Sequence, residues 1–373
     1  MNAQMKLEEI DKNFKTAELG GNPIRFYNAH VAPFSVEGFP WRKEGELTFY
    51  RLPRELTSAE VNEGALWLAN QTAGGAIRFR TDSKYIAIRA KLVYSSDMNH
   101  MPRAGSAGFD IYLGTGAKAM HVGTAQPCRD QEQMEQMIFT HPDHKGKILD
   151  YTLDLPLYGG CEAVEIGVEP GAKILPPSKH KYDLPVLFYG SSITQGGCAS
   201  RPGNAYTSRL CKTVKAPQVN LGFSGSGRGE IAVANAIASV PLSAFVMDYD
   251  HNAPTLEHLE ATHEPFFKAI RAAQPELPVI FMSKCDIWVE LGEDCPAVKA
   301  GRQRRDVIRR TYENALKAGD KNVYFVDGDT LFGNSERTAC TVDRCHPNDL
   351  GFERMYRAVL PTLKKALKNR WGK

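Results

Sequence analysis

The hydrophobic periodicity of this chain changes near residue 180. Before that point, apolar residues recur at every second position in several short segments, including 86–92 and 151–157. Period 2 gives a strand one buried and one solvated face, which is typical of antiparallel sheets. Because many such segments are separated by Gly, Pro and Asp, with few helical patterns between them, residues 21–178 are predicted to form an antiparallel β-sandwich of the jelly-roll-like kind.

After a proline-containing connector at 170–178, the apolar residues form short, uninterrupted runs, which are typical of parallel strands buried on both faces. The runs lie at residues 186–189, 244–247, 279–282 and 323–326. Segments with helical periodicity separate them. Alternating strands and helices predict a doubly wound α/β domain over residues 179–373. Residues 1–20 are left as an N-terminal extension.

The composition excludes several classes of protein. With 373 residues, 42% of them apolar and 24% charged, and a net charge of +3, the chain has ample core material for two globular domains. It has no basic stripe, so no nucleic-acid partner is expected. It also has no apolar run long enough to insert into a membrane. The sequence does not indicate the oligomeric state.

The eight cysteines lack the paired spacing of a zinc-binding motif. Two short-spaced pairs, Cys285/Cys295 and Cys340/Cys345, are compatible with disulfides in an oxidising compartment or with reduced thiols. The first residues have neither the charged nor the apolar region of a signal peptide. A periplasmic or secreted location after removal of a signal peptide, and a cytoplasmic location, therefore both remain open.

In doubly wound domains, functional groups lie just beyond the carboxyl ends of the strands. The run 186–189 leads into a Gly-Ser-Ser-Ile-Thr turn that presents Ser192 as a candidate nucleophile. Such a serine needs a base, a group that orients the base, and donors for the oxyanion. Beyond the last run, Asp343 lies three residues before His346. Asp343 can fix the imidazole tautomer while the other nitrogen of His346 faces Ser192.

Two further segments offer oxyanion donors. The glycine-rich stretch 220–227, which includes Gly225, lets the backbone approach a ligand closely, and it lacks the GxGxxG spacing of a dinucleotide site. Asn252 follows the run 244–247 and can aim its side-chain amide at the same oxyanion. Taken alone, Asn252 is better explained as a turn residue before Pro254.

Four blocks in this order resemble those of the SGNH (GDSL-type) hydrolase superfamily. The blocks are residues 190–194, Ser224-Gly225, Asn252, and Asp343 with His346. The resemblance implies a three-layer, flavodoxin-like hydrolase domain. It implies Ser192 as the nucleophile, His346 as the base and Asp343 as the residue that orients the base. It also implies an oxyanion hole made of the backbone N–H groups of Ser192 and Gly225 and the side-chain amide of Asn252. This chemistry requires neither a metal nor a cofactor.

The chain departs from the superfamily pattern at two positions. Ser191 stands where the superfamily usually has Asp, and Asn252 lies in Asp-Tyr-Asp-His-Asn rather than Gly-x-Asn-Asp. The second variant is similar to a two-domain bacterial branch whose β-sandwich carries a Gly-x-Asp-Leu-Tyr motif. Residues 108–112, Gly-Phe-Asp-Ile-Tyr, match that motif with Ile for Leu. Members of that branch are mostly described as esterases of unassigned substrate, and two-domain relatives deacetylate plant polysaccharides.

The sequence therefore predicts a serine esterase that hydrolyses small acyl esters, above all O-acetyl groups on carbohydrate, with a small-molecule or glycan ester as its substrate. Two alternatives stay open: an O-acyltransferase that uses the same acyl-enzyme, and a catalytically degenerate carbohydrate-binding protein, which Ser191 keeps open. Trp288, just past a strand, is a candidate for substrate binding. Trp41 and Trp67 are expected to pack in the sandwich core.

Several other segments carry weaker signals. Asp327 and Asp329 are alternatives to Asp343, but neither has a His three residues on. The His-Pro-Asp-His stretch at 141–144 is expected to be a solvated loop rather than a metal site. The loop 99–106 is apolar enough to pack against another surface. A fixed interface between the two domains is therefore expected, with loops from residues 1–180 narrowing the cleft above Ser192; a separate module whose loops face solvent is the alternative.

Overall fold

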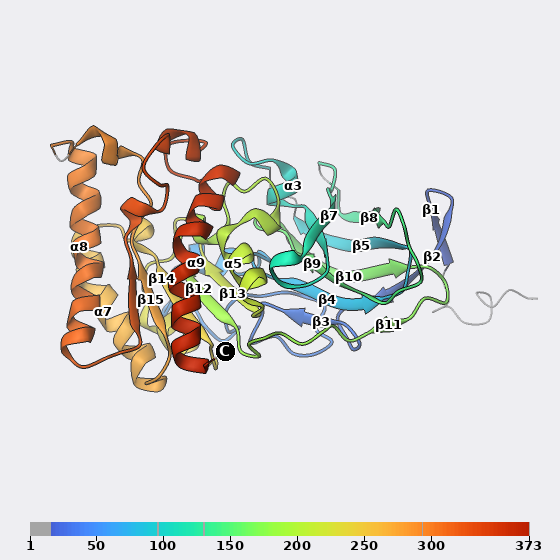
Figure 1. Cartoon of the computed structure of the whole chain (residues 1–373), viewed down its shortest axis with the longest axis horizontal. Coiled ribbons are helices and arrows are strands. Elements are labelled where there is room, and N and C mark those ends of the chain that lie inside the picture. The colour runs from blue at the N-terminus through green and yellow to red at the C-terminus, as the bar shows by residue number, and fades with distance from the viewer. Residues whose placement is uncertain (1–15, 95–96, 130, 293, 373) are drawn as a thin grey trace, which may run out of the picture.

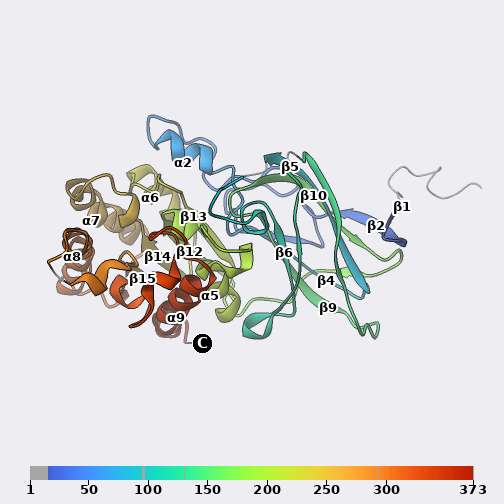
Figure 2. The ribbon, with the colours of Figure 1, turned by 90° about the horizontal axis from the view of Figure 1, so that it is seen from above.

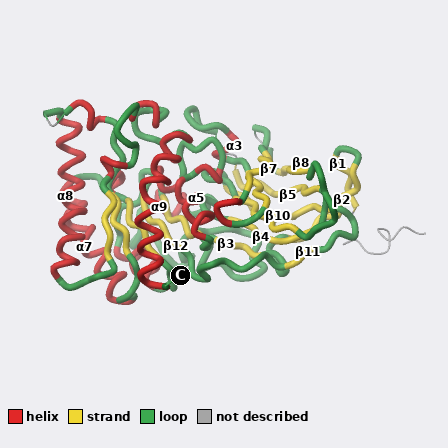
Figure 3. The backbone as a smooth tube through the Cα atoms, viewed as in Figure 1, coloured by secondary structure: helices red, strands yellow, loops and turns green. Residues whose placement is uncertain are grey.

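The computed structural model describes residues 16–94, 97–129, 131–292 and 294–372. Strands gather at one end of the longest axis, and helices surround a second set of strands at the other end (Figures 1 and 3). Residues 1–15 of the predicted extension lie outside the described residues, and residues 16–19 form β1, which pairs with β2. Within the described ranges, no helix is long and apolar enough to cross a membrane.

The N-terminal part consists of two antiparallel sheets, which confirms the predicted sandwich. The first sheet has the order β1 (Thr16–Leu19), β2 (Asn22–Asn28), β10 (Gly160–Val168), β5 (Tyr85–Tyr94) and β8 (Gln133–Thr140). The second has the order β11 (Ile174–Leu175), β4 (Ala76–Thr81), β9 (Leu149–Asp154), β6 (Phe109–Leu113) and β7 (Met120–Ala125), with β3 (Ser35–Glu37) beside β4. Phe79, Ile88 and Leu153, from both sheets, are fully buried in one core. Short helical segments are α2 (Glu63–Leu68), α3 (Arg103–Ser106) and η1 (Gly116–Lys118).

The C-terminal part is built on one parallel sheet of five strands. Their order is β13 (Gln218–Gly222), β12 (Val186–Gly190), β14 (Ala244–Asp248), β15 (Val279–Met282) and β16 (Val323–Val326). The first strand in the chain therefore lies between the second and the third, which is the flavodoxin-like order of a doubly wound sheet. Ligands of such sheets bind outside the carboxyl ends of the strands, at the point where the strand order reverses.

Helices cover both faces of this sheet, which completes the predicted three layers. On one face, α5 (Tyr206–Val214) and α9 (Asp349–Trp371) pack on alternate residues of β12 such as Phe188. On the other face, α6 (Ile231–Ala238), α7 (Leu256–Ala273) and α8 (Pro296–Lys317) pack on the intervening residues such as Tyr189. The remaining segments are α4 (Ser192–Gln195), η2 (Pro202–Asn204), η3 (Asp250–Asn252), η4 (Trp288–Leu291), η5 (Gly328–Thr330) and η6 (Arg337–Cys340).

One segment of the N-terminal part joins the core of the parallel sheet. Leu52, Val61 and Leu68 are buried in the same cluster as Phe223 from the turn after β13. Figure 2 shows α2 lying over β13 and α6, away from the sandwich sheets. The prediction that Trp67 packs in the sandwich core is therefore wrong: it lies on α2, and its side chain is 59% exposed. Trp41 packs against the core of the parallel sheet instead of the sandwich core.

The Gly-x-Asp-x-Tyr motif forms a second connection between the two parts. Asp110 is fully buried and accepts hydrogen bonds from the Arg201 guanidinium at 2.9 Å and the Gly203 backbone N–H at 3.0 Å. Tyr112 accepts another from Arg201 at 2.5 Å. Burial acts to raise the pKa of Asp110, but the hydrogen bond with His121 and the charge of Arg201 hold that pKa below its usual value. The motif therefore fixes the segment that follows α4 to the sandwich.

The buried Asp110 contact should contribute measurably to stability. We expect Asp110→Asn, which keeps the shape but removes the charge beside Arg201, to lower the free energy of unfolding by about 1–3 kcal/mol in urea titrations. Asp143→Asn is the matched control, because Asp143 pairs with Lys145 on an exposed surface, where such a pair contributes less than about 1 kcal/mol. Equal losses in the two variants would show that the motif does not stabilise the contact between the parts.

Candidate active site

The turn after β12 presents Ser192 at the carboxyl edge of the sheet. Ser191 precedes α4 as its N-cap, and its hydroxyl oxygen accepts a hydrogen bond from the backbone N–H of Ile193 at 3.1 Å. Ser and Asp are both favoured at this helix position, because each has a short side chain with an acceptor oxygen. The replacement of the usual Asp by Ser191 therefore keeps the local structure. Gly190 is required for a steric reason: a Cβ there would lie 2.1 Å from the Asp248 carbonyl oxygen.

The structure brings Ser192, His346 and Asp343 together in one line of hydrogen bonds. The Ser192 Oγ lies 2.9 Å from the His346 Nε2, and the His346 Nδ1 lies 2.7 Å from the Asp343 Oδ2. The Asp343 Oδ1 also accepts the backbone N–H groups of His346 at 2.7 Å and Cys345 at 3.0 Å. Burial acts to raise the pKa of Asp343, but the hydrogen bonds from His346 and Cys345 lower it to about 2. The carboxylate is therefore ionised at neutral pH and holds the imidazole in one orientation.

The predicted oxyanion donors lie around the same turn. Gly225 has a φ of +67°, and no heavy atom lies within 4 Å of the position that its Cβ would take. Within the described residues, the backbone N–H groups of Ser192 and Gly225 donate to no protein acceptor. Asn252 ends η3, and its side-chain amide donates to the Phe223 carbonyl oxygen at 2.7 Å. An amide nitrogen carries two hydrogens, so Asn252 has one left for a ligand.

Residues of the N-terminal part form hydrogen bonds with the turn that carries Ser192 and with α4. The Tyr158 hydroxyl donates to the Ser192 carbonyl oxygen at 3.2 Å. The Gln195 amide, in α4, donates to Gln71 and to the Leu157 carbonyl, while its oxygen accepts the backbone N–H of Ser224 at 3.0 Å. Sequence reasoning missed these residues, because no local pattern marks a glutamine or tyrosine that meets a turn from another domain.

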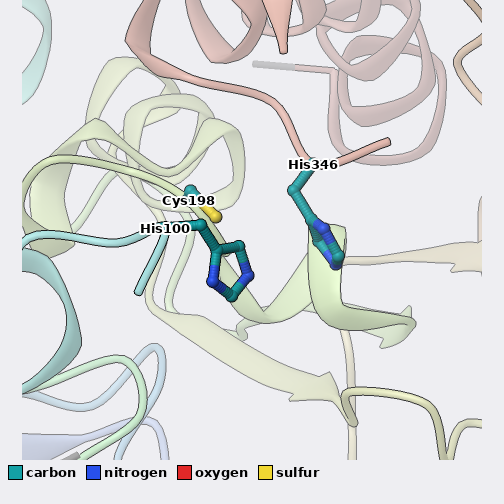
Figure 4. A group of neighbouring side chains, drawn as sticks. All are labelled: His100, Cys198 and His346. Atoms are coloured by element: carbon teal, nitrogen blue, oxygen red, sulfur yellow. The ribbon is translucent and has the colours of Figure 1, made fainter. Parts of the chain in front are cut away.

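Residues 97–102, which precede α3, reach the site, and the apolar loop 99–106 packs against the hydrolase domain. Met101 is buried in the core beneath α5 and α9, and a Cβ at Gly105 would lie 2.1 Å from the Ala199 carbonyl oxygen. The ring of His100 faces that of His346 edge-on, with centroids 5.5 Å apart. The buried Cys198 lies beside both rings (Figure 4). Burial raises the pKa of the Cys198 thiol to about 12, so that thiol is protonated at neutral pH.

The alternative carboxylates are engaged elsewhere. Asp327 accepts a hydrogen bond from Arg309 at 3.1 Å, and Asp329 pairs with Arg305. Trp288 is half-buried, and the guanidinium of Arg344, which lies in the Asp343–His346 loop, sits 5.9 Å from the centroid of its ring. All eight cysteines are free thiols, including the two short-spaced pairs.

Two sequence families match consecutive stretches of the chain. Residues 183–364 match the GDSL-like lipase/acylhydrolase family, and residues 24–174 match the GxDLY family, the N-terminus of SGNH-hydrolase-type esterases. The first stretch contains the whole parallel sheet together with Ser192, Asp343 and His346. The chain belongs to the SGNH (GDSL-type) hydrolase family, in the two-domain branch with an N-terminal GxDLY domain.

Solved structures similar to this chain carry both parts. A protein from Bacteroides ovatus described as a GDSL-like lipase has 28% sequence identity and a TM-score of 0.80, over 92% of this chain and 98% of its own. A salicylyl-acyltransferase from a tetracycline biosynthetic pathway has 19% identity and a TM-score of 0.74, over 92% and 97%. An acetyl xylan esterase from the rumen bacterium Butyrivibrio proteoclasticus has 11% identity and a TM-score of 0.59, over 92% and 98%. No curated protein matches the chain in sequence. The family supports an ester hydrolase of the lipase/acylhydrolase kind, whereas the neighbours with 19% and 11% identity show the fold.

The hydrogen bonds distinguish Asp343, which contacts His346, from the alternative carboxylates Asp327 and Asp329, which contact arginines. We expect Asp343→Asn to lower the kcat for hydrolysis of a chromogenic acetyl ester by about 10⁴-fold, because an amide favours the wrong imidazole tautomer. Asp327→Asn, at the carboxylate held by Arg309, should leave kcat within about twofold. Thermal unfolding of both variants checks that the fold is intact. If Asp327→Asn is the damaging change, the proposed assignment of Asp343 is wrong.

Proposed function

We propose that this protein is a serine esterase that removes small acyl groups, above all O-acetyl groups, from carbohydrate. The observation that carries the proposal is the unbroken relay from the Ser192 Oγ through His346 to Asp343, with steps of 2.9 Å and 2.7 Å. A degenerate binding protein has no need to keep that alignment. The capping role of Ser191 also removes the reason for suspecting that its departure from the family pattern abolishes activity.

In the proposed mechanism, Ser192 attacks the ester carbonyl while His346 takes its proton. Ionised Asp343 stabilises the imidazolium that forms. The negative charge on the carbonyl oxygen is bound by the backbone N–H groups of Ser192 and Gly225 and by the Asn252 amide. His346 then gives its proton to the leaving alcohol, which leaves an acyl-enzyme. Water, deprotonated by the same imidazole, releases the carboxylic acid and restores Ser192.

A carbohydrate substrate is supported by one feature of the site and by one neighbour. Trp288 presents a half-buried indole beside the Asp343–His346 loop, and a flat aromatic ring is a suitable surface for a sugar. The acetyl xylan esterase has the same two-part architecture. The second candidate function is acyl transfer, which is supported by the salicylyl-acyltransferase. Both reactions pass through the same acyl-enzyme, and only the acceptor, water or an alcohol, distinguishes them.

A first experiment tests the nucleophile and the reaction class together. We expect Ser192→Ala to lower kcat for a chromogenic acetyl ester by at least about 10⁴-fold, because the attacking oxygen is lost. Ser239→Ala, at the far end of α6, is the matched control and should keep the wild-type rate. Equal and negligible rates for wild type and Ser192→Ala would overturn the esterase proposal.

The same assay can determine the substrate class. If the substrate is a glycan, Trp288→Ala should raise KM for an acetylated xylo-oligosaccharide more than KM for the small ester. Adding an alcohol acceptor and measuring the ratio of new ester to free acid distinguishes acyl transfer from hydrolysis. Ester as the main product in dilute acceptor would favour the transferase.

The oxyanion role of Asn252 predicts a specific kinetic signature. Asn252→Ala should lower kcat by about 10²–10³-fold with a smaller change in KM, because the amide binds charge that develops only in the transition state. Asn235→Ala, at an exposed position of α6, is the matched control. Since Asn252 also binds the Phe223 carbonyl, urea unfolding must show that the variant is folded. An unchanged kcat would remove Asn252 from the proposed oxyanion hole.

A further inference from the structure

Three side chains with metal-binding atoms converge beside the proposed catalytic base. One ligand atom from each of His100, Cys198 and His346 lies within 4.8 Å of the other two. The three residues come from separate segments: the loop after β5, the segment after α4, and the loop before α9. Figure 4 shows His100 and Cys198 together on one side, with His346 facing them across a short gap. The proposed esterase mechanism uses only His346 among them.

Two imidazoles and one thiolate form a ligand set that suits zinc. Zn²⁺ binds Cys sulfur at about 2.3 Å and His nitrogen at about 2.0–2.1 Å, and sites with three protein ligands keep the fourth position for water. In a tetrahedral site such bond lengths place the ligand atoms roughly 3.3–3.6 Å apart. The present separations of at most 4.8 Å therefore need only a small inward movement. His100, whose side chain is exposed on a loop, can move toward the other two ligands, and a rotation of the His346 ring away from Ser192 closes the remaining separation.

We propose that Zn²⁺ binds between His100, Cys198 and His346 and reversibly inhibits the enzyme. Binding displaces the thiol proton of Cys198 to solvent and uses a nitrogen lone pair on each imidazole. Both nitrogens of His346 already have partners, with Nε2 next to the Ser192 Oγ and Nδ1 next to Asp343. A metal ion on either nitrogen therefore breaks the relay. The metal site stands on its own geometry, and only its inhibitory effect rests on the proposed esterase function.

The site differs from other histidines that lie near each other. His141 and His144 also have ring centroids 5.7 Å apart, but both lie in one loop and no cysteine joins them in the described part of the chain. Two histidines alone bind zinc weakly compared with a set of three ligands that includes a thiolate. His144→Ala is therefore a suitable control for non-specific binding of the metal.

The binding experiment uses the full-length Ser192→Ala protein, freed of metal with a chelator and titrated with zinc chloride against a chromogenic chelator. We expect one ion per chain. Adding Cys198→Ser or His100→Ala should weaken the affinity by roughly tenfold or more, equivalent to about 1.4 kcal/mol, whereas His144→Ala should leave it unchanged. Co²⁺ is a second probe, since a thiolate ligand gives a sulfur-to-cobalt charge-transfer band that Cys198→Ser should abolish. Equal affinities in all variants, or a cobalt band that persists in Cys198→Ser, would overturn the site.

The inhibition experiment uses wild type, His100→Ala and Cys198→Ser in an acetyl-ester assay, with each rate normalised to the same protein in chelator. Zinc should inhibit wild type, excess chelator should restore the rate, and both variants should need roughly tenfold more zinc or more for half-inhibition. Inhibition that is equal in the three proteins would refute the inference and leave the esterase proposal intact. Zinc binding through all three residues in a chain without any esterase activity would refute the proposed function and support the metal site.

Discussion

The position of the proposed active site depends on one buried guanidinium. Arg51 is fully buried, and carbonyl oxygens of both parts of the chain accept its hydrogen bonds. Nη1 donates to Asn220 at 3.0 Å and Gly222 at 2.7 Å, while Nε and Nη2 donate at 2.8 Å to Gln71 and Leu68. An arginine cannot lose its proton inside a protein, so this charge is stabilised by peptide dipoles in a fixed arrangement. Two of the acceptors are in the last three residues of β13, directly before the turn that contains Gly225.

This arrangement makes the site a property of the whole chain. Arg51 positions the turn that carries Gly225, and its guanidinium lies over the ring of Phe223. The Phe223 carbonyl oxygen in turn accepts a hydrogen bond from the Asn252 amide. On the other side, Tyr158 contacts the backbone of Ser192. The proposed catalytic groups all belong to the C-terminal part, but Arg51 and Tyr158, which hold parts of their backbone in place, belong to the N-terminal part. A hydrolase domain alone would expose the apolar face that α2 covers, and an exposed patch of that kind favours association with other molecules.

The sequence predicted those features that follow from strand order. Ser192 and His346 are 154 positions apart, yet they meet because parallel strands bring their carboxyl ends to one edge of the sheet. Hydrophobic periodicity identified both folds for the same reason, since it reports how many faces of a strand are buried. Periodicity does not indicate whether a segment is buried in the sandwich core or in the core of the parallel sheet. The segment around Trp67 has enough apolar residues to pack, but it leaves the sandwich and covers the other domain, so the prediction for Trp67 failed.

Contacts between loops from different domains were beyond sequence reasoning for a different physical reason. The apolar content of residues 99–106 was sufficient to predict that this loop packs against another surface, because buried apolar area drives such packing without directional preference. Which side chain then meets His346 depends on the path of the loop, and nothing in the local sequence distinguishes His100 from its neighbours.

That proximity of His100 to His346 couples the structure of the sandwich to the chemistry of the base. A nitrogen lone pair of His346 can bind one partner at a time: a proton taken from Ser192, or a metal ion that His100 and Cys198 also hold. A ligand that binds only when His346 is protonated therefore competes with the metal ion. By reciprocity, the metal weakens such a ligand by the same factor as the ligand weakens the metal. The loop that places His100 beside His346 thus also supplies the second imidazole through which the base can be withdrawn from catalysis.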